Sequence, residues 1–367
     1  MPRVIGLMSG SSLDGLDIAC VDFLRSTDQW SFEILHAQTI PYSAEWIDRL
    51  SHADQLDARS YLLLHTSYGR YLGECVNAFL EKHHLRIEEI DLIASHGHTV
   101  FHEPWNRMTG QIGDGAAICA ETRLSVVSDL RALDVAYGGQ GAPIVPIGEK
   151  FLFSQYRLLL NLGGIANMTD QKYHIAFDIC PANRVLNKLM SDFLEKEYDE
   201  NGQHAAQGTV NEDLLKQLNE LDYYEKIYPK SLSNTFGLEI VYPMLTSREL
   251  PIHDLLRTYV EHIVQQICRS IQMIIDREEQ LPSSYAGCQM LVTGGGAHNQ
   301  YLFQCLQSQL RAKFGIEVQY PEIKVVDFKE ALIMAWIGLL RVENQPNVLA
   351  SVTGAKIDSI GGAFWKN

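Results

Sequence analysis

Alternating apolar and polar positions mark three neighbouring stretches near the start of the chain, each bounded by a polar turn. They predict a meander of antiparallel strands over 3–8, 16–23 and 31–40. Leucines and tyrosines at helical spacing then predict a helix over 58–82. Further short apolar runs predict strands over 91–95 and 124–128, and a polar, glycine-rich loop follows at 138–143.

The second half of the chain starts the same order of elements again. The expected elements are strands over 157–161, 164–168 and 173–178, a helix over 182–196, a strand over 289–293, a helix over 298–313, a strand over 316–320 and a helix over 328–343. A long amphipathic helix lies between them, with an apolar face of Leu256, Val260, Ile263, Val264, Ile267, Ile271 and Ile274. Three strands followed by a helix in both halves indicate an ancient duplication, although no repeat is visible residue by residue.

The loop between the first two strands is rich in glycine, serine and aspartate. Gly10 and Gly15 let the backbone turn back, so that amide N–H groups and the hydroxyls of Ser9, Ser11 and Ser12 can face an anion. The alternative is an ordinary serine-glycine hairpin. The residues expected to bind a nucleotide phosphate here are Gly10, Ser11, Ser12, Leu13, Asp14, Gly15, Leu16 and Asp17.

Two further apolar strands run into glycine turns, at Gly163–Gly164 and at Gly294–Gly296. Neither turn has the spacing of a P-loop or of a Rossmann fingerprint, which excludes both of those folds. Three glycine turns, with a hairpin first, resemble the actin, Hsp70 and sugar-kinase architecture. That resemblance implies a duplicated RNase H-like α/β fold of two lobes, with ATP in the cleft between them.

Length and composition are consistent with two lobes. The chain has 367 residues, more than a single hydrophobic core usually spans. We expect one lobe at 1–150, joined by the C-terminal segment 337–367, and the other at 151–336. A formal charge of −15 argues against nucleic acid and acidic membranes as partners, so phosphate binding must use backbone amides and a bound Mg²⁺.

Neither a membrane span nor a signal peptide is evident in the sequence, and the seven cysteines are scattered. We therefore expect a cytoplasmic protein with free thiols.

Specific motifs identify the chain as a member of the anhydro-N-acetylmuramic acid kinase family. They are G-x-M-S-G-S-S-x-D-G-x-D at 6–17, S-H-G-H-T-V at 95–100, Q-I-G-D at 111–114, G-G-Q-G-A-P at 138–143, N-x-G-G-x-A-N at 161–167, F-D-I-C-P-A-N at 177–183, G-G-G-A at 294–297, E-A at 330–331 and V-T-G-A at 352–355. The resemblance implies ATP-dependent hydrolysis of a 1,6-anhydro ring with phosphorylation at O6. It also implies a small amino-sugar substrate and a homodimer. Ser11, His98, Cys180 and Ala182 depart from the residues common in the family, as do Ala132 and Leu133, which replace further arginine.

The reaction needs one carboxylate base, because the γ-phosphoryl group takes the place of the acid at the leaving oxygen. The family's base falls on Asp178, at the end of a predicted strand. The alternative is that Asp178 caps the helix expected from Ala182. Glu330 is the second carboxylate by resemblance, orienting the water or the sugar, and its alternative is simply to complement a helix dipole.

The remaining candidates surround the sugar and the metal. By resemblance, the sugar contacts include His96, Gly97 and Asn183. Asp129 and Arg131 follow a strand and are candidates for the sugar hydroxyls and the lactyl carboxylate, which arginine grips in a bidentate manner. Asp14 and Asp17 are candidates to hold Mg²⁺ through water, although aspartate also stabilises turns.

Two rival interpretations stay open. His96, His98 and His102 have a spacing that a zinc hydrolase could use, although no further ligand accompanies them. A nucleotide-binding regulator that kept the fold and lost turnover is the other rival.

Overall fold

The computed structural model describes residues 1–10, 13–26, 30–173, 175–233, 235–278 and 282–367. Contacts divide the chain into two units. Unit 1 comprises Met1–Ser154 and Phe328–Asn367, and unit 2 comprises Gln155–Asp327. The boundaries expected from the sequence were 150 and 336.

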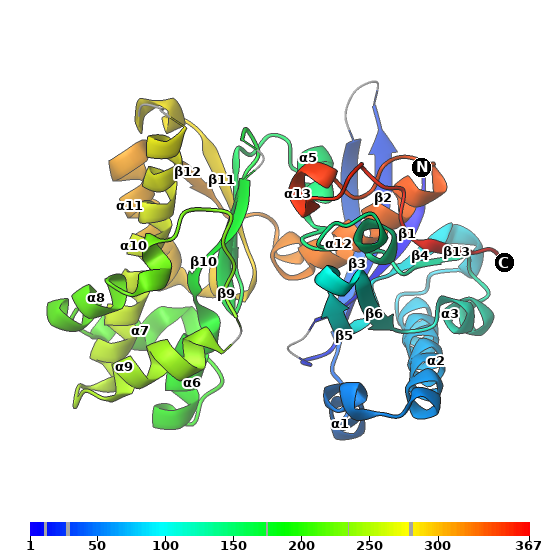
Figure 1. Ribbon diagram of the computed structural model, residues 1–367, viewed down its shortest axis with the longest axis horizontal. Helices are drawn as coiled ribbons and strands as arrows, with labels where there is room; N and C mark the ends of the chain where they lie inside the picture. The colour runs from blue at the N-terminus through cyan, green and yellow to red at the C-terminus, as the bar shows by residue number, and fades with distance from the viewer. Residues whose placement is uncertain (11–12, 27–29, 174, 234, 279–281) are drawn as a thin grey trace. The chain divides into compact units, whose positions relative to one another are not determined.

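Unit 1 is built on a sheet in the order β13-β7-β4-β1-β2-β3 (Figure 1). Its strands are β1 (Arg3–Ser9), β2 (Leu16–Arg25), β3 (Trp30–Ile40), β4 (Leu92–Ser95), β7 (Val126–Ser128) and β13 (Ala363–Trp365). The first three pair as the expected antiparallel meander. Strand β4 is parallel to β1, and β7 is parallel to β4.

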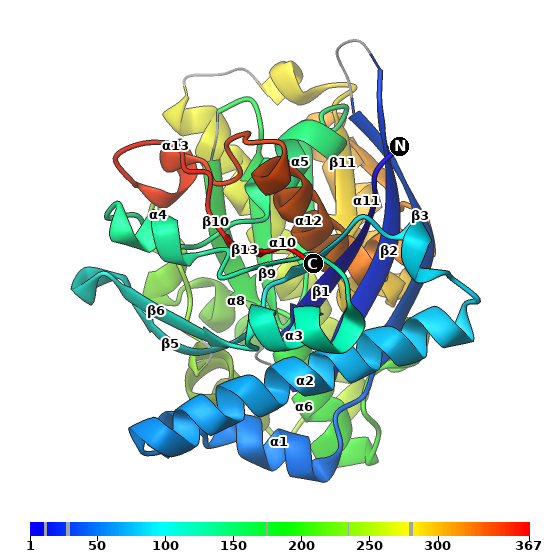
Figure 2. The same ribbon diagram turned by 90° about the vertical axis from the view of Figure 1, so that its right-hand side faces the viewer.

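Helices cover both faces of this sheet. The long helix α2 (Ala58–Lys82) packs Tyr68, Leu72 and Val76 against the buried side chains of β1 and β2, with α3 (Gly115–Thr122) beside it (Figure 2). On the other face, α12 (Ile323–Val342) comes so close to β1 that a Cβ at Gly6 would lie 1.9 Å from the Ala331 carbonyl oxygen. Strands β1, β2, β3, β4 and β7 of unit 1 therefore form the middle layer of a sandwich of helices.

Unit 1 also contains smaller elements outside its main sheet and long helices. They are α1 (Ala44–Ser51), the hairpin β5 (His98–Glu103) and β6 (Met108–Ile112), α4 (Ala132–Ala136), α5 (Pro146–Leu152) and α13 (Ala350–Thr353). The hairpin forms a separate two-stranded sheet. None of these short elements was expected from the apolar pattern.

Unit 2 has a sheet in the order β10-β9-β8-β11-β12 (Figure 1). Its strands are β8 (Leu158–Leu162), β9 (Ile165–Asp170), β10 (Ile175–Pro181), β11 (Gln289–Thr293) and β12 (Glu317–Gln319). Again the first three strands are an antiparallel meander, and the next two are parallel to the first. Counted along the chain within each main sheet, the first five strands of both units are therefore ordered 3-2-1-4-5, and the expected duplicated α/β fold is confirmed.

The core of unit 2 lies between this sheet and its helices. These are α6 (Asn183–Leu194), α7 (Gln203–Gln207), α8 (Glu212–Asn219), α9 (Tyr242–Thr246), α10 (Ile252–Arg277) and α11 (Gln300–Phe314). All seven residues of the apolar face expected in the long helix are buried in α10. The four expected helices and the short strands match the structure to within a few residues.

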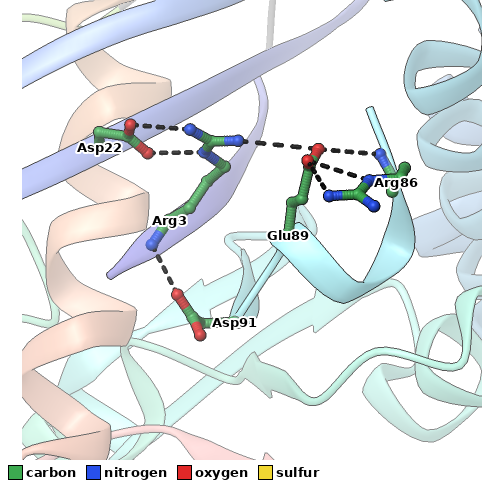
Figure 3. A network of polar contacts seen from close by, with 5 residues as sticks. All are labelled: Arg3, Asp22, Arg86, Glu89 and Asp91. Carbon is green, nitrogen blue, oxygen red and sulfur yellow. Dashed lines mark hydrogen bonds and ion pairs between the residues drawn. The ribbon is translucent and has the colours of Figure 1, made fainter. Parts of the chain in front are cut away.

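A polar network fixes the first strand to its neighbours (Figure 3). The Arg3 guanidinium donates two hydrogen bonds to Asp22, at 2.7 and 2.9 Å. Its backbone N–H donates to Asp91, and Glu89 lies 3.9 Å from Arg3 Nη1. The start of β1 is thus tied to β2 and to the segment before β4.

In the described ranges, no helix combines the length and apolar character that a membrane span requires.

Candidate active site

The candidate residues of unit 2 gather at one end of its sheet. Register pairs Thr293 with Asn161, Asn161 with Asn167, and Asn167 with Asp178. Side chains of directly paired residues lie on the same face of a sheet, so these four form one polar row across β11, β8, β9 and β10. The row connects the turn at Gly294 with Asp178.

Asp178 is the last residue before a β-bulge in β10. A bulge changes the direction of the side chains around it and is common near active sites. The Asp178 carboxylate accepts a hydrogen bond from the Leu232 N–H at 2.8 Å, and its backbone carbonyl accepts one from Tyr223 Oη at 2.7 Å. Desolvation raises the pKa of Asp178, and the Leu232 N–H opposes that rise.

Asp178 does not cap helix α6, which was the alternative role expected for it. Helix α6 begins at Asn183, and its N-cap is Ala182, which makes no side-chain capping bond. The Asp178 carboxylate is instead bound to the Leu232 segment.

The two glycine turns of unit 2 lie side by side. A Cβ at Gly294 would lie 2.4 Å from Asn161 Oδ1, and one at Gly296 would lie 2.8 Å from Asn183 Oδ1. Thr293, directly before the first of these, is buried, and its hydroxyl has no hydrogen-bond partner within the described part of the chain. Glycine leaves the backbone of these turns open to close approach, and the Thr293 hydroxyl beside them lacks a partner within the described residues. Together these features fit the binding of a polar ligand.

Asn183 belongs to this group of glycine turns. Its side-chain amide donates to the Leu162 carbonyl at 2.9 Å, and its backbone N–H donates to the Gly163 carbonyl. Its expected contact with the sugar stays a prediction. Gly163, Gly164 and Gly295 have room for a Cβ, with neighbours at 3.4 Å or beyond.

In unit 1, the hairpin between β1 and β2 is the expected phosphate loop. Leu13 has a positive φ of 59°, and its N–H pairs weakly with the Gly10 carbonyl at 3.4 Å. A Cβ at Gly15 would lie 2.6 Å from the Ile40 carbonyl oxygen, which requires glycine there. Leu16 is buried in the core, so only its backbone is available to a ligand. Ser11 and Ser12 lie outside the described residues.

The expectation for the Ser9 hydroxyl is wrong. Ser9 is only 3% exposed, and its hydroxyl accepts a hydrogen bond from Tyr42 Oη at 2.8 Å. It also lies 3.0 Å from His98 Nδ1. These contacts within unit 1 hold the end of β1 and leave the hydroxyl unavailable to an anion.

The two acidic residues of the hairpin differ in their surroundings. Asp14 is exposed, whereas Asp17 is half-buried and accepts a hydrogen bond from Thr39 Oγ1 at 2.5 Å. The bond from Thr39 joins Asp17 on β2 to β3, and the Mg²⁺ role of both carboxylates stays a prediction.

His96, which is buried, and Arg131, which is half-buried, form a pair in unit 1. Arg131 Nε donates to His96 Nε2 at 2.7 Å, and His96 Nδ1 lies 2.9 Å from the Gly97 carbonyl, which fixes the neutral tautomer with its proton on Nδ1. Burial, followed by the Arg131 charge, lowers the pKa of His96 to about 3. Both ring nitrogens are used, so His96 orients Arg131, and its predicted contact with the sugar stays untested.

Arg131 is oriented from a second side as well. Its Nη1 donates to the Gly141 carbonyl at 2.6 Å, and burial lowers its pKa to about 10. Gly97 has a positive φ of 71°, and a Cβ there would lie 2.5 Å from the Ile112 carbonyl oxygen.

Asp129 also has a positive φ and accepts a hydrogen bond from Ser128 Oγ at 2.8 Å, with its side chain exposed at the end of β7.

Glu330 lies in α12, two residues after Phe328, where the helix is interrupted. Surrounding protein raises the pKa of Glu330 by desolvation, and the charges of Lys329 and Arg131 oppose this rise. The side chain retains solvent access. Its position in the first turn after the interruption also fits the helix-dipole alternative.

The histidines do not assemble a metal centre in the part of the chain that the structure describes, where no group of three or more metal-binding side chains is found. His98 is bound to Ser9, and His102 Nδ1 lies 3.1 Å from Thr109 Oγ1.

Asn161, Asn167 and Thr293 were not among the candidate residues of the sequence analysis, although they lie in the polar row with Asp178. The signal was present in N-x-G-G-x-A-N, because a tight turn at Gly163–Gly164 pairs residues placed symmetrically on either side of it.

The duplicated sheets and their paired glycine turns define an α/β protein of the actin, Hsp70 and sugar-kinase class. Residues 2–367 match the family model of anhydro-N-acetylmuramic acid kinase, and the chain belongs to that family.

Curated relatives agree over nearly the whole length. The anhydro-N-acetylmuramic acid kinase of Coxiella burnetii is 34% identical, covering 99% of this chain and 97% of that protein. The kinase of the same name from Shewanella frigidimarina is also 34% identical, covering 98% and 97%. Among solved structures, component A of (R)-2-hydroxyglutaryl-CoA dehydratase from Acidaminococcus fermentans covers 94% of this chain and 100% of its own, with 14% identity and a TM-score of 0.45.

Proposed function

We propose that this protein is an ATP-dependent kinase that opens the 1,6-anhydro ring of anhydro-N-acetylmuramic acid with water and phosphorylates O6, giving N-acetylmuramic acid 6-phosphate. The observation that carries the proposal is Asp178, a half-buried carboxylate with a raised pKa at the end of the polar row. Membership of the family over the full chain supports the same reaction. The rival interpretation, a regulator without turnover, is not favoured, because the relatives carry the name of an enzyme.

Asp178 accepts a proton from water as the water oxygen attacks C1. The C1–O6 bond breaks, and O6 attacks the γ-phosphorus, whose bond to the ADP oxygen breaks. The proton on Asp178 is then released to solvent. A raised carboxylate pKa makes Asp178 a stronger base than an ordinary surface aspartate, provided that it is ionised at the working pH.

The glycine turns are the proposed nucleotide site. In unit 2, Gly163–Gly164 and Gly294–Gly296 offer backbone next to the unpartnered Thr293 hydroxyl. In unit 1, the proposed phosphate contact is the backbone of the hairpin that joins β1 and β2. The residues fit Mg²⁺ as well, since Asp14 presents an exposed carboxylate on this hairpin. When bound, the metal would neutralise charge on the transferred phosphoryl group.

The sugar contacts we propose belong to unit 1. The Arg131 guanidinium, held by His96 and Gly141, binds the lactyl carboxylate, and Asp129 binds a hydroxyl. Glu330 orients the sugar or the attacking water.

We further propose a cytoplasmic homodimer. Seven free cysteines are consistent with a reducing compartment. Leu62 and Leu63 on α2, each 61% exposed, together with Trp105, 76% exposed, offer apolar surface for association.

The direct test is incubation of the purified protein with ATP, Mg²⁺ and anhydro-N-acetylmuramic acid, with ADP and sugar phosphate measured by mass spectrometry. We expect one ADP for each sugar phosphate. Hydrolysis of ATP without a sugar product, or no turnover of either compound, would contradict the proposal.

A further inference from the structure

Unit 1 contains a buried carboxylate to which the expected mechanism gives no part. Asp134, on α4, is 0% exposed. Its Oδ1 accepts a hydrogen bond from Thr353 Oγ1 at 2.7 Å, and its Oδ2 accepts one from the Gly141 N–H at 2.8 Å. A buried charge is costly unless such donors surround it, so this arrangement needs a reason beyond packing.

The loop at 138–142 is built around that carboxylate. A Cβ at Gly139 would lie 2.2 Å from Asp134 Oδ2, so only glycine leaves room for it. The Gln140 N–H donates to the Thr353 carbonyl at 2.9 Å. Thr353 ends α13, a segment more than two hundred positions later in the chain. Its carbonyl holds the loop directly, and its hydroxyl holds the Asp134 carboxylate around which the loop is built.

The same loop meets Arg131 through Gly141. The Gly141 N–H is bound to Asp134, while the Gly141 carbonyl accepts from Arg131 Nη1 at 2.6 Å. His96 holds the Nε of the same guanidinium. An uninterrupted series of contacts thus runs from Thr353 through Asp134 and Gly141 to Arg131.

We propose that Asp134 and Thr353 are positioning residues, which fix the Gly141 carbonyl and thereby aim the Arg131 guanidinium at the carboxylate of the substrate. The inference rests on the proposed role of Arg131 in the function above. It assigns a role to the V-T-G-A segment at 352–355, which lies more than two hundred positions after Arg131.

Misplacing the Arg131 guanidinium should affect only substrates that carry a carboxylate. A guanidinium that is poorly aimed loses its bidentate grip on a carboxylate, but it has little effect on a sugar that carries no carboxylate. The test therefore compares two substrates: anhydro-N-acetylmuramic acid, and the 1,6-anhydro N-acetylated sugar that lacks the lactyl ether.

Thr353→Val is the informative variant, because it keeps the shape of the side chain and removes the donor to Asp134. We expect KM for the carboxylate sugar to rise about tenfold, with KM for ATP and for the sugar without the lactyl group near wild type. Thr353→Ser restores the hydroxyl and should restore KM. Asp134→Asn makes the same comparison if Thr353→Val does not fold.

Thr122→Val is the matched control. Thr122 is also buried at a helix end in unit 1, but its hydroxyl bonds only to backbone groups of its own segment, at Ile118 and Leu124. It should not alter the ratio between the two sugars. Arg131→Met supplies the reference, with a large loss that is confined to the carboxylate sugar.

The outcomes separate the inference from the function on which it rests. If Arg131→Met is selective but Thr353→Val behaves like Thr122→Val, or weakens both sugars equally, the positioning role is overturned and the proposed function stands. If Arg131→Met does not discriminate between the sugars, the role of Arg131 is wrong and the inference falls with it. If the wild-type protein turns over neither sugar, the proposed function itself fails.

Discussion

At the scale of single residues, Asp178 combines partial burial with one strong hydrogen-bond donor. Burial raises its pKa, and the Leu232 N–H limits the rise by stabilising the charged form. The β-bulge beside it sets its direction. These are the surroundings expected of a base that must be ionised near neutral pH yet able to take a proton from water.

The pH dependence of turnover follows from this raised pKa. As the pH falls, Asp178 becomes protonated earlier than an ordinary aspartate, so kcat/KM should decline along an acid limb that lies above the usual aspartate range. Asp178→Asn should lower kcat by about 10²–10⁴-fold, with ATP affinity unchanged in calorimetry. Asp192→Asn, at an exposed position on α6 in the same unit, should keep both the rate and the acid limb. A normal rate in Asp178→Asn would remove Asp178 from the mechanism.

Whether the role of a residue can be predicted from sequence depends on whether its contacts are local or distant along the chain. Asp178 and the glycine turns follow from strand ends and from local turn chemistry, which a short window of sequence contains. The contacts of the Ser9 hydroxyl with Tyr42 and His98 could not be predicted from sequence, because these partners are 33 and 89 positions away. Asp134 and Thr353, separated by 219 positions, were invisible for the same reason.

At the scale of elements, a buried ion pair connects α5 with α12 inside unit 1. Lys329 Nζ lies 3.0 Å from Glu149 Oε1, and the two side chains are 6% and 5% exposed. The other Glu149 oxygen has no hydrogen-bond partner among the described residues. Helix α5 lies just before the chain leaves unit 1, and Lys329 lies just after it returns, so the pair holds these two points of the chain together.

Removing one partner of this pair should be costly. Lys329→Met leaves the Glu149 carboxylate buried without its counter-charge, which should lower the free energy of unfolding by about 3–5 kcal/mol. The double variant with Glu149→Met carries no buried charge and should recover most of that loss. Urea denaturation of the two variants and the wild type measures both effects. A single variant within about 1 kcal/mol of wild type, or a double variant no better than the single, would contradict this interpretation.

The elements that sequence predicted best are those with long apolar periodicity. The helix at 58–82 and the strand at 289–293 have the bounds expected. The hairpin of β5 and β6 was not predicted, because its residues are largely polar and half-buried and give no apolar pattern. Strand β13 is three residues long, and pairing with β7 rather than local pattern makes it a strand.

At the scale of the whole molecule, two copies of one sheet topology carry different candidate residues. Unit 1 has the hairpin between β1 and β2, Arg131 and Glu330, and unit 2 has Asp178 and the two glycine turns. Each unit also contains a histidine that is 3% exposed or less: His96 in unit 1, at 3%, and His262 in unit 2, at 0%. Burial is the main cause that lowers the pKa of both to about 3.

These histidines predict how stability depends on pH. Below their ordinary pKa near 6.5 the unfolded chain binds protons that the folded chain excludes, so the free energy of unfolding should fall as the pH drops from about 6.5 toward 3. The loss approaches about 1.4 kcal/mol per pH unit for each histidine. His262→Gln should reduce the slope measured by urea denaturation between pH 7.5 and 5.5, and His84→Gln, at an exposed position, should not. An unchanged slope in His262→Gln would mean that His262 is charged in the folded protein.

The central claim is that one reaction opens the anhydro ring and phosphorylates O6, and isotope labelling tests it most directly. The protein is incubated with ATP, Mg²⁺ and anhydro-N-acetylmuramic acid in ¹⁸O-water, and the product is fragmented by mass spectrometry. Water attacks C1, whereas the oxygen that accepts the phosphoryl group is the sugar's original O6. The ¹⁸O label should therefore be found on the C1 hydroxyl, measured before anomeric exchange, and not in the phosphate. Label in the phosphate of the sugar product, or an opened sugar without phosphate, would contradict the account.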